Sequence, residues 1–207
     1  MKRFSNILVA LGVTVFLMIV GKKSEVKAQC LAGFTYKKDT LMIGGCPWEI
    51  ELCFKCGLSY PGEVKVNSAT PIPQFPPCTP VTLQQALDYA YSQLANYDYI
   101  INELCQTYPS IPPCPQQSQA IRIHHNYCWK MTRIIYHGQE TIRFTACPSD
   151  GCYEDVTFCH DGTNINRIST GYMTGPPTCG LEESMATVPT VVGQSSDCFI
   201  YHSPCNP

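Results

Sequence analysis

The sequence lacks the features that most readily assign a chain to a functional class. Beyond the N-terminus it has no run of about 18 or more apolar residues, so we expect no internal membrane-spanning helix. It has no glycine-rich phosphate loop, no dinucleotide-binding fingerprint, no Gly-x-Ser-x-Gly nucleophile motif and no His-Glu-x-x-His zinc motif. We therefore predict no cofactor from sequence motifs.

Positive charge is scarce as well. The chain has 14 Lys and Arg residues against 16 Asp and Glu residues, and its formal net charge is −2 at pH 7. Outside the N-terminal segment, the longest basic feature is Lys37-Lys38. Because nucleic-acid binding needs a basic stripe that neutralises phosphates, we exclude nucleic acid as a partner.

Residues 1–28 have the pattern of a secretory signal peptide. A basic start at residues 2–3 precedes an apolar stretch over residues 7–20, and residues 26–28 offer small side chains for cleavage. The alternative is an uncleaved anchor, because Lys22 and Lys23 follow the apolar stretch, where positive charge hinders export. The segment holds five basic residues and one acidic residue, so its removal lowers the net charge from −2 to −6. We predict a secreted, periplasmic or cell-surface protein.

The remaining chain, residues 29–207, is predicted to be a single cysteine-rich domain. It contains all 14 cysteines, an even number, and cysteines of exported proteins normally form disulfides. Their connectivity cannot be deduced from the sequence. We predict that all of them are in disulfides: Cys30, Cys46, Cys53, Cys56, Cys78, Cys105, Cys114, Cys128, Cys147, Cys152, Cys159, Cys179, Cys198 and Cys205.

One pair of cysteines, Cys53 and Cys56, has Cys-x-x-Cys spacing. Such pairs occur in zinc knuckles and in thiol–disulfide proteins. No histidine follows at knuckle spacing, and the pair ends an alternating strand, whereas reactive dithiols favour the start of a helix. Structural disulfides are therefore the favoured interpretation.

Alternating apolar and polar residues predict half-buried strands joined as antiparallel hairpins. The strands are expected at residues 48–55, 63–69, 121–131 (with a bend or bulge), 141–146, 153–160 and 163–169.

A single long amphipathic helix is expected over residues 82–106. Thr82 and Gln85 form a capping-box pattern, and apolar residues then recur at steps of three and four. Tyr89 and Tyr99 fall off the apolar stripe and are either simply exposed or part of a contact surface. The predicted fold class is thus α+β: an antiparallel sheet of β-hairpins with one long helix packed on it, in a disulfide-rich chain.

A weak internal repeat relates residues 46–78 to residues 152–179. In both segments two cysteines at the same spacing bracket a strand, and a proline pair precedes a later cysteine. The alternative explanation is that both segments are β-hairpins and share the sequence pattern common to hairpins. A true duplication predicts two equivalent bridges: Cys53–Cys78 and Cys159–Cys179.

Three polar groupings invite a catalytic or metal-binding interpretation. His124 and His125 are neighbours on a strand and so face opposite sides, which prevents both from binding one ion. The oxygen-rich residues 161–166 are better explained by a hairpin turn than by calcium. Glu49 and Glu51 share a strand face at a spacing that suits glycoside hydrolysis, but a solvated polar face is the simpler interpretation. We assign no catalytic and no metal-binding residues.

The function we predict is not enzymatic. We expect an exported, disulfide-stabilised binding or structural module, with a protein or surface-glycan partner or with self-assembly. One alternative is a secreted hydrolase whose site is assembled from loops, which a pocket with convergent His and carboxylate groups would favour. Another is a periplasmic thiol–disulfide protein that uses Cys53 and Cys56. Exposed sheet edges would favour assembly.

Overall fold

A computed structural model describes residues 30–57, 62–74, 79, 81–106, 110–117, 121–148 and 151–203. The predicted signal peptide lies outside these ranges, as do Cys78 and Cys205. Within the described ranges, no helix is long and apolar enough to cross a membrane.

The chain is mostly β, with 49% strand and 15% helix, so the predicted α+β class with one long helix is wrong. Within the described ranges, ten strands form one mixed sheet. They are β1 (Thr35–Ile43), β2 (Cys46–Lys55), β3 (Gly62–Pro71), β4 (Ile121–Asn126), β5 (Cys128–Tyr136), β6 (Gln139–Ala146), β7 (Gly151–His160), β8 (Ile165–Met173), β9 (Leu181–Glu182) and β10 (Phe199–Ile200).

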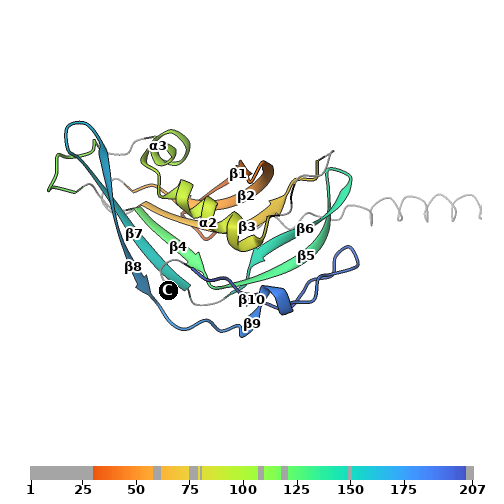
Figure 1. The fold of residues 1–207 in the computed structure, drawn as a ribbon. Helices are drawn as coiled ribbons and strands as arrows, with labels where there is room; N and C mark the ends of the chain where they lie inside the picture. Colours follow the sequence, from red (N-terminus) through yellow and green to blue (C-terminus); the bar gives the residue numbers. More distant parts are fainter. Residues whose placement is uncertain are drawn as a thin grey trace, which may run out of the picture.

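The sheet branches at β3. One edge of β3 pairs with β2, which pairs with β1. The other edge pairs first in parallel with β4 and then antiparallel with β6. Strands β7 and β8 continue the sheet from β4, and β5, β10 and β9 continue it from β6. The strands curve around the helix α2 (Leu83–Leu94), which lies in the hollow of the sheet (Figure 1).

The predicted helix over residues 82–106 is broken. Its start is confirmed, since the backbone N–H of Gln85 donates to the Thr82 hydroxyl and the Gln85 side chain accepts from the Thr82 N–H. Helix α2 ends at Leu94, and two short pieces follow: α3 (Tyr97–Tyr99) and a π-helical turn, η1 (Ile100–Leu104).

Asn96 explains the break. Its backbone is extended (φ −92°, ψ 129°), and its side-chain oxygen accepts hydrogen bonds from the backbone N–H groups of Asp98 and Tyr99. Asn96 thus caps a second helical turn. Apolar periodicity does not reveal this break, because Ile100 and Leu104 still reach the core beyond it.

The two faces of the sheet differ in polarity, as the alternation predicts. The inner face forms the core with α2, and the outer face carries polar and aromatic side chains. Buried core residues include Trp48, Ile50, Leu52, Val64, Val66, Ile121, Ile123, Trp129, Phe144, Val156 and Phe158 on the strands and Leu83, Leu87 and Leu94 on α2.

Each predicted strand is found, one of them is divided, and β1, β9 and β10 were not predicted. The long strand over residues 121–131 is two strands, β4 and β5, which meet at Tyr127. The sequence did not reveal β1, because Lys37 and Asp39 occupy its inner face and interrupt the apolar pattern. These side chains bind Tyr99 and Glu103 of the helical segment instead of entering an apolar core.

The cysteines within the described ranges are disulfide-bonded, and none of them is free. Cys46 and Cys152 are also bonded. This chemistry indicates maturation in an oxidising environment. The fully described bridges are Cys30–Cys53, Cys56–Cys105, Cys114–Cys159, Cys128–Cys179 and Cys147–Cys198.

The predicted bridges Cys53–Cys78 and Cys159–Cys179 are wrong, because Cys53 is bonded to Cys30, Cys159 to Cys114 and Cys179 to Cys128. The internal repeat itself stays a prediction. Cys53 and Cys56 also pair with different partners, so they do not form the joint disulfide that a Cys-x-x-Cys redox site requires.

Candidate functional site

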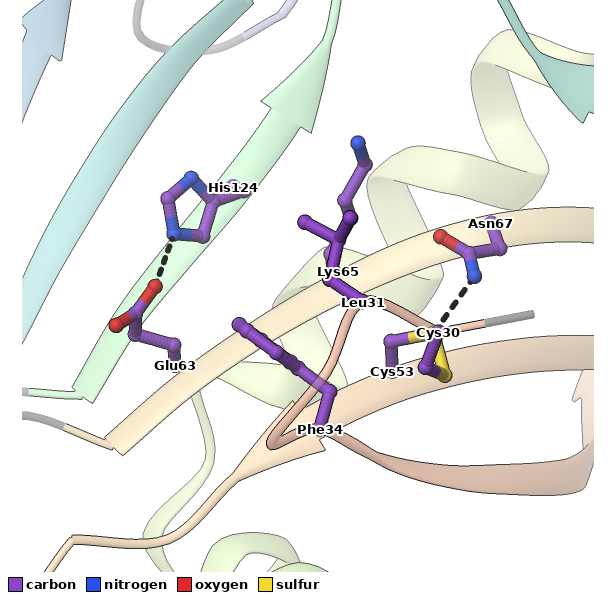
Figure 2. Close-up of a pocket in the computed structure, with 8 residues that line it drawn as sticks. All are labelled: Cys30, Leu31, Phe34, Cys53, Glu63, Lys65, Asn67 and His124. Carbon is purple, nitrogen blue, oxygen red and sulfur yellow. Dashed lines mark hydrogen bonds and ion pairs between the residues drawn. A yellow bond between two sulfur atoms is a disulfide. The ribbon is translucent and has the colours of Figure 1, made fainter.

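A cavity of about 380 Å³ lies on the outer face of the sheet, where residues 30–34 meet strands β2, β3 and β4 (Figure 2). Cavities of this size suit small ligands. It combines one apolar wall with several polar groups, and its lining residues are Cys30, Leu31, Phe34, Cys53, Glu63, Lys65, Asn67 and His124.

Strand register brings the polar lining together. Along β3, Glu63 and Lys65 alternate with the core residues Val64 and Val66, so they point to the outer face. Lys65 lies opposite Cys53 of β2 on one side and opposite His124 of β4 on the other. Three strands thus supply side chains to one small area.

Lys65 is the central charged group of the cavity. Its side chain is half-buried, and no residue in the described ranges forms an ion pair or hydrogen bond with its ammonium group. Burial lowers the pKa of Lys65 below its ordinary value. Figure 2 shows its side chain between the His124–Glu63 pair and the Asn67 amide. A partly dehydrated cation without a counterion is a natural place for an anionic ligand group.

His124 and Glu63 form a pair beside this lysine. The Nε2 atom of His124 lies 3.1 Å from a carboxylate oxygen of Glu63. Burial lowers the pKa of His124, and the positive charges of Lys65 and Arg122 act in the same direction, against the opposing effect of Glu63. His124 is therefore mainly neutral at pH 7, and a neutral imidazole can donate one hydrogen bond and accept another.

A disulfide fixes the opposite wall. Cys30 is bonded to Cys53, and the side-chain amide of Asn67 donates to the Cys53 sulfur at 2.7 Å. Leu31 and Phe34 follow Cys30 and give this wall its apolar character. The cavity therefore has a cationic floor and an apolar wall, and the wall is covalently tied to β2.

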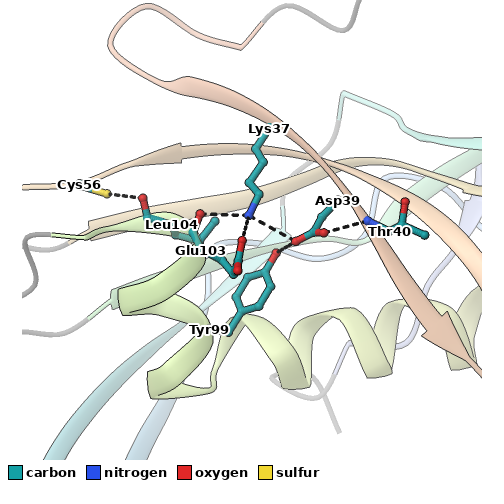
Figure 3. A network of polar contacts seen from close by, with 7 residues as sticks. All are labelled: Lys37, Asp39, Thr40, Cys56, Tyr99, Glu103 and Leu104. Carbon is teal, nitrogen blue, oxygen red and sulfur yellow. Dashed lines mark hydrogen bonds and ion pairs between the residues drawn. The ribbon is translucent and has the colours of Figure 1, made fainter.

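The two tyrosines that fall off the apolar stripe, Tyr89 and Tyr99, have different surroundings in the structure. Tyr89 lies on α2 and is 40% exposed. Tyr99 donates a 2.6 Å hydrogen bond to Asp39, and Lys37 bridges Asp39 and Glu103 above the same ring (Figure 3). Burial, followed by the hydrogen bond to Asp39, raises the pKa of Tyr99. Tyr99 therefore fastens the helical segment to β1.

Glu49 and Glu51 share a strand face, as predicted, but the interpretation that they are solvated is wrong. They are only 8% and 3% exposed. The Lys38 ammonium group lies 3.0 Å from Glu49 and 3.3 Å from Glu51, and the Tyr136 hydroxyl donates to Glu49 at 2.6 Å. Burial and this hydrogen bond raise the pKa of Tyr136 to about 12. The fold itself thus supplies ion-pair or hydrogen-bond partners for both carboxylates.

Two further predictions, the opposite orientation of the two neighbouring histidines and the turn at residues 161–166, are confirmed. His124 and His125 face opposite sides of the sheet, since His124 lines the outer cavity and His125 is buried against Tyr91 of α2. The side chain of Asp161 accepts hydrogen bonds from the backbone N–H groups of Thr163 and Asn164, which is turn chemistry. Among the described residues, no three His, Cys, Asp or Glu side chains are grouped so that they could hold a metal ion.

Glu63 and Lys65 were not predicted as site residues, because the parallel pairing of β3 with β4 that brings them to His124 is non-local. No protein-family model matches the chain, and neither a curated protein nor a solved structure is detectably similar to it.

Proposed function

We propose that the mature chain is an extracytoplasmic binding module that holds an acidic ligand in the cavity formed by residues 30–34 and strands β2 to β4. One observation carries this proposal. Lys65 is half-buried in the cavity, and its ammonium group has no partner among the described residues. A ligand carboxylate would supply the missing counterion and form a charge-assisted hydrogen bond.

The neighbouring charges favour an anion at Lys65 and not elsewhere in the cavity. Glu63 is engaged by His124, and Arg122 forms two hydrogen bonds with Asp155. Leu31 and Phe34 can pack against an apolar part of the same ligand. The disulfides and the predicted signal peptide support an extracytoplasmic location.

Binding of simple acids tests the proposal. We expect N-acetylneuraminate or D-galacturonate to bind the purified mature protein, measured by calorimetry or by NMR chemical shifts, and neutral D-galactose not to bind. Lys65→Met should weaken binding by about tenfold or more, because a charge-assisted hydrogen bond is lost. Lys130→Met is the matched control, since Lys130 is a half-buried lysine of β5 that does not line the cavity. Acid binding that is absent, or that is unchanged in Lys65→Met, contradicts the proposal.

A secreted hydrolase is the second candidate, because the cavity brings His124 and Glu63 within 3.1 Å of each other. Such a pair can activate a water molecule, with the nearby Lys65 ammonium group stabilising negative charge. The lining offers no free thiol or hydroxyl nucleophile in the part of the chain that the structure describes, since both cysteines are in a disulfide. Turnover of nitrophenyl esters or glycosides that is lost in His124→Gln would favour this candidate. Acid binding without turnover favours the first.

A further inference from the structure

We infer that the acidic ligand is an oligosaccharide that lies across the strands, with its acidic group at Lys65 and a sugar ring against Tyr172. This inference rests on the proposed function and names the ligand class of the same site. It follows from a row of side chains that leads from the cavity to the edge of the sheet.

The row contains one residue from each of four neighbouring strands. Lys65 of β3 lies opposite His124 of β4, His124 lies opposite Tyr153 of β7, and Tyr153 lies opposite Tyr172 of β8. Residues directly opposite each other share a sheet face. Since neighbouring strands are about 4.8 Å apart, the three steps span about 14 Å. A ligand longer than one sugar unit is needed to touch both ends.

The far end of the row is a prearranged aromatic surface. The ring of Tyr153 is stacked on that of Tyr172, with centroids 5.0 Å apart and planes 27° apart. The guanidinium group of Arg122 lies 4.0 Å from the centroid of the Tyr153 ring. These contacts position Tyr172, which remains 44% exposed. A sugar ring packs its C–H face against such a surface at a small entropic cost, because the tyrosine is already ordered.

Hydrogen-bonding groups that are already paired with one another flank the middle of the row. Arg122 bonds both carboxylate oxygens of Asp155 at 2.8 and 2.9 Å, and His124 is paired with Glu63. Carboxylates accept hydrogen bonds and guanidinium groups donate them. Their unused hydrogen-bonding positions therefore suit the hydroxyl groups of a sugar, which both donate and accept. Lys65 is then the cation without a partner in this row, which places the ligand's negative charge at the cavity end.

The direction of the row favours a glycan over a peptide. A peptide that extends the sheet runs along the edge strand β8 and bonds its backbone. The row instead runs at right angles to the strands and uses side chains on the face. Preferential binding of an acidic peptide would therefore contradict the inference.

The test measures the affinity of the mature protein for two acidic trisaccharides, 3′-sialyllactose and trigalacturonate, by calorimetry. The comparison ligands are the corresponding acidic monosaccharides, the neutral disaccharide lactose and the acidic peptide triaspartate. We expect at least one trisaccharide to bind about tenfold more tightly than its monosaccharide. Tyr172→Ala should remove that gain and leave monosaccharide binding unchanged, whereas Tyr172→Phe should retain it. Lys65→Met should weaken both ligands. Tyr89→Ala, which removes a similarly exposed tyrosine from α2, should change neither.

The outcomes separate the two proposals. If no acid binds in a Lys65-dependent way, the proposed function fails. Two outcomes overturn only the oligosaccharide inference when acidic monosaccharides do bind through Lys65. In the first, neither trisaccharide binds more tightly than its monosaccharide. In the second, the gain in affinity survives Tyr172→Ala in a variant that has a normal unfolding transition. Tighter binding of triaspartate than of both trisaccharides also overturns it.

Discussion

The Nε2 atom of His125 lies 3.5 Å from a carboxylate oxygen of Glu154, and the His125 side chain has no exposed surface. The His125 ring also packs on Tyr91, with centroids 4.0 Å apart. These contacts join β4, β7 and α2 on the inner side of the sheet. Interaction with His125 is the main cause of a lowered pKa at Glu154, ahead of burial, which acts in the opposite direction.

Glu154→Gln should therefore make stability less dependent on pH. Because the pKa of Glu154 in the folded state is below its ordinary value of 4.5, the ionised carboxylate stabilises the fold. This contribution is complete above that value and is lost as the pH falls through the lowered pKa. We expect a cost of about 1 kcal/mol at pH 7 after allowance for solvent screening, and almost none at strongly acidic pH. Urea unfolding at several pH values measures it, with the exposed Glu140→Gln as the control. A cost that is the same at every pH would contradict the assignment.

Tyr99→Phe should destabilise the protein, and Tyr89→Phe should not. The Tyr99 hydroxyl donates to the Asp39 carboxylate at 2.6 Å, whereas Tyr89 is 40% exposed on α2. Loss of a hydrogen bond to a charged acceptor costs about 1.5 kcal/mol in the free energy of unfolding. Chemical denaturation of the two variants measures the difference directly. Equal stability of both variants would mean that the network in Figure 3 does not fasten α3 to β1.

Local patterns predicted the strands well because each strand has one apolar and one polar face. Residues 48–55 illustrate this, since Trp48, Ile50 and Leu52 enter the core while Glu49 and Glu51 do not. The same reasoning failed where a polar contact decides the structure. Asn96 ends a helix whose apolar periodicity continues past it, and its capping hydrogen bonds leave no trace in hydrophobic spacing.

The candidate site was less predictable because its parts are distant in sequence. Lys65 and His124 meet through the parallel pairing of β3 with β4, which no hairpin signal specifies. Cys30 and Cys53 close the cavity through one of many pairings that an even number of cysteines allows. The ion pair between the buried Glu49 and Lys38 likewise depends on β1, which the sequence did not reveal.

Removal of the Cys30–Cys53 bridge should affect both stability and binding. In a chain-entropy model, this bridge and Cys147–Cys198 stabilise the fold by about 3 and 4 kcal/mol, because they join residues 23 and 51 positions apart. Both double Ala variants should therefore unfold at lower denaturant concentrations. Only the first should also lose affinity for N-acetylneuraminate, because Cys30 and Cys53 line the cavity. Equal affinity in both variants, measured under folding conditions, would show that the disulfide wall does not shape the site.

Binding of an acidic ligand should strengthen as the pH falls, because His124 gains a positive charge beside Lys65. Burial and the charges of Lys65 and Arg122 lower the pKa of His124 from 6.5, against the effect of Glu63, so this gain begins below that value. The ligand carboxylate stays ionised over the range from pH 8 to pH 5. One added charge, partly offset by Glu63, should raise the affinity by about three- to tenfold, which corresponds to roughly 1 kcal/mol.

Calorimetry with N-acetylneuraminate at several pH values measures the rise. His124→Gln should flatten the profile while leaving the affinity at pH 8 nearly unchanged, since His124 is neutral there. A rise that persists in this variant would assign the titration to another group.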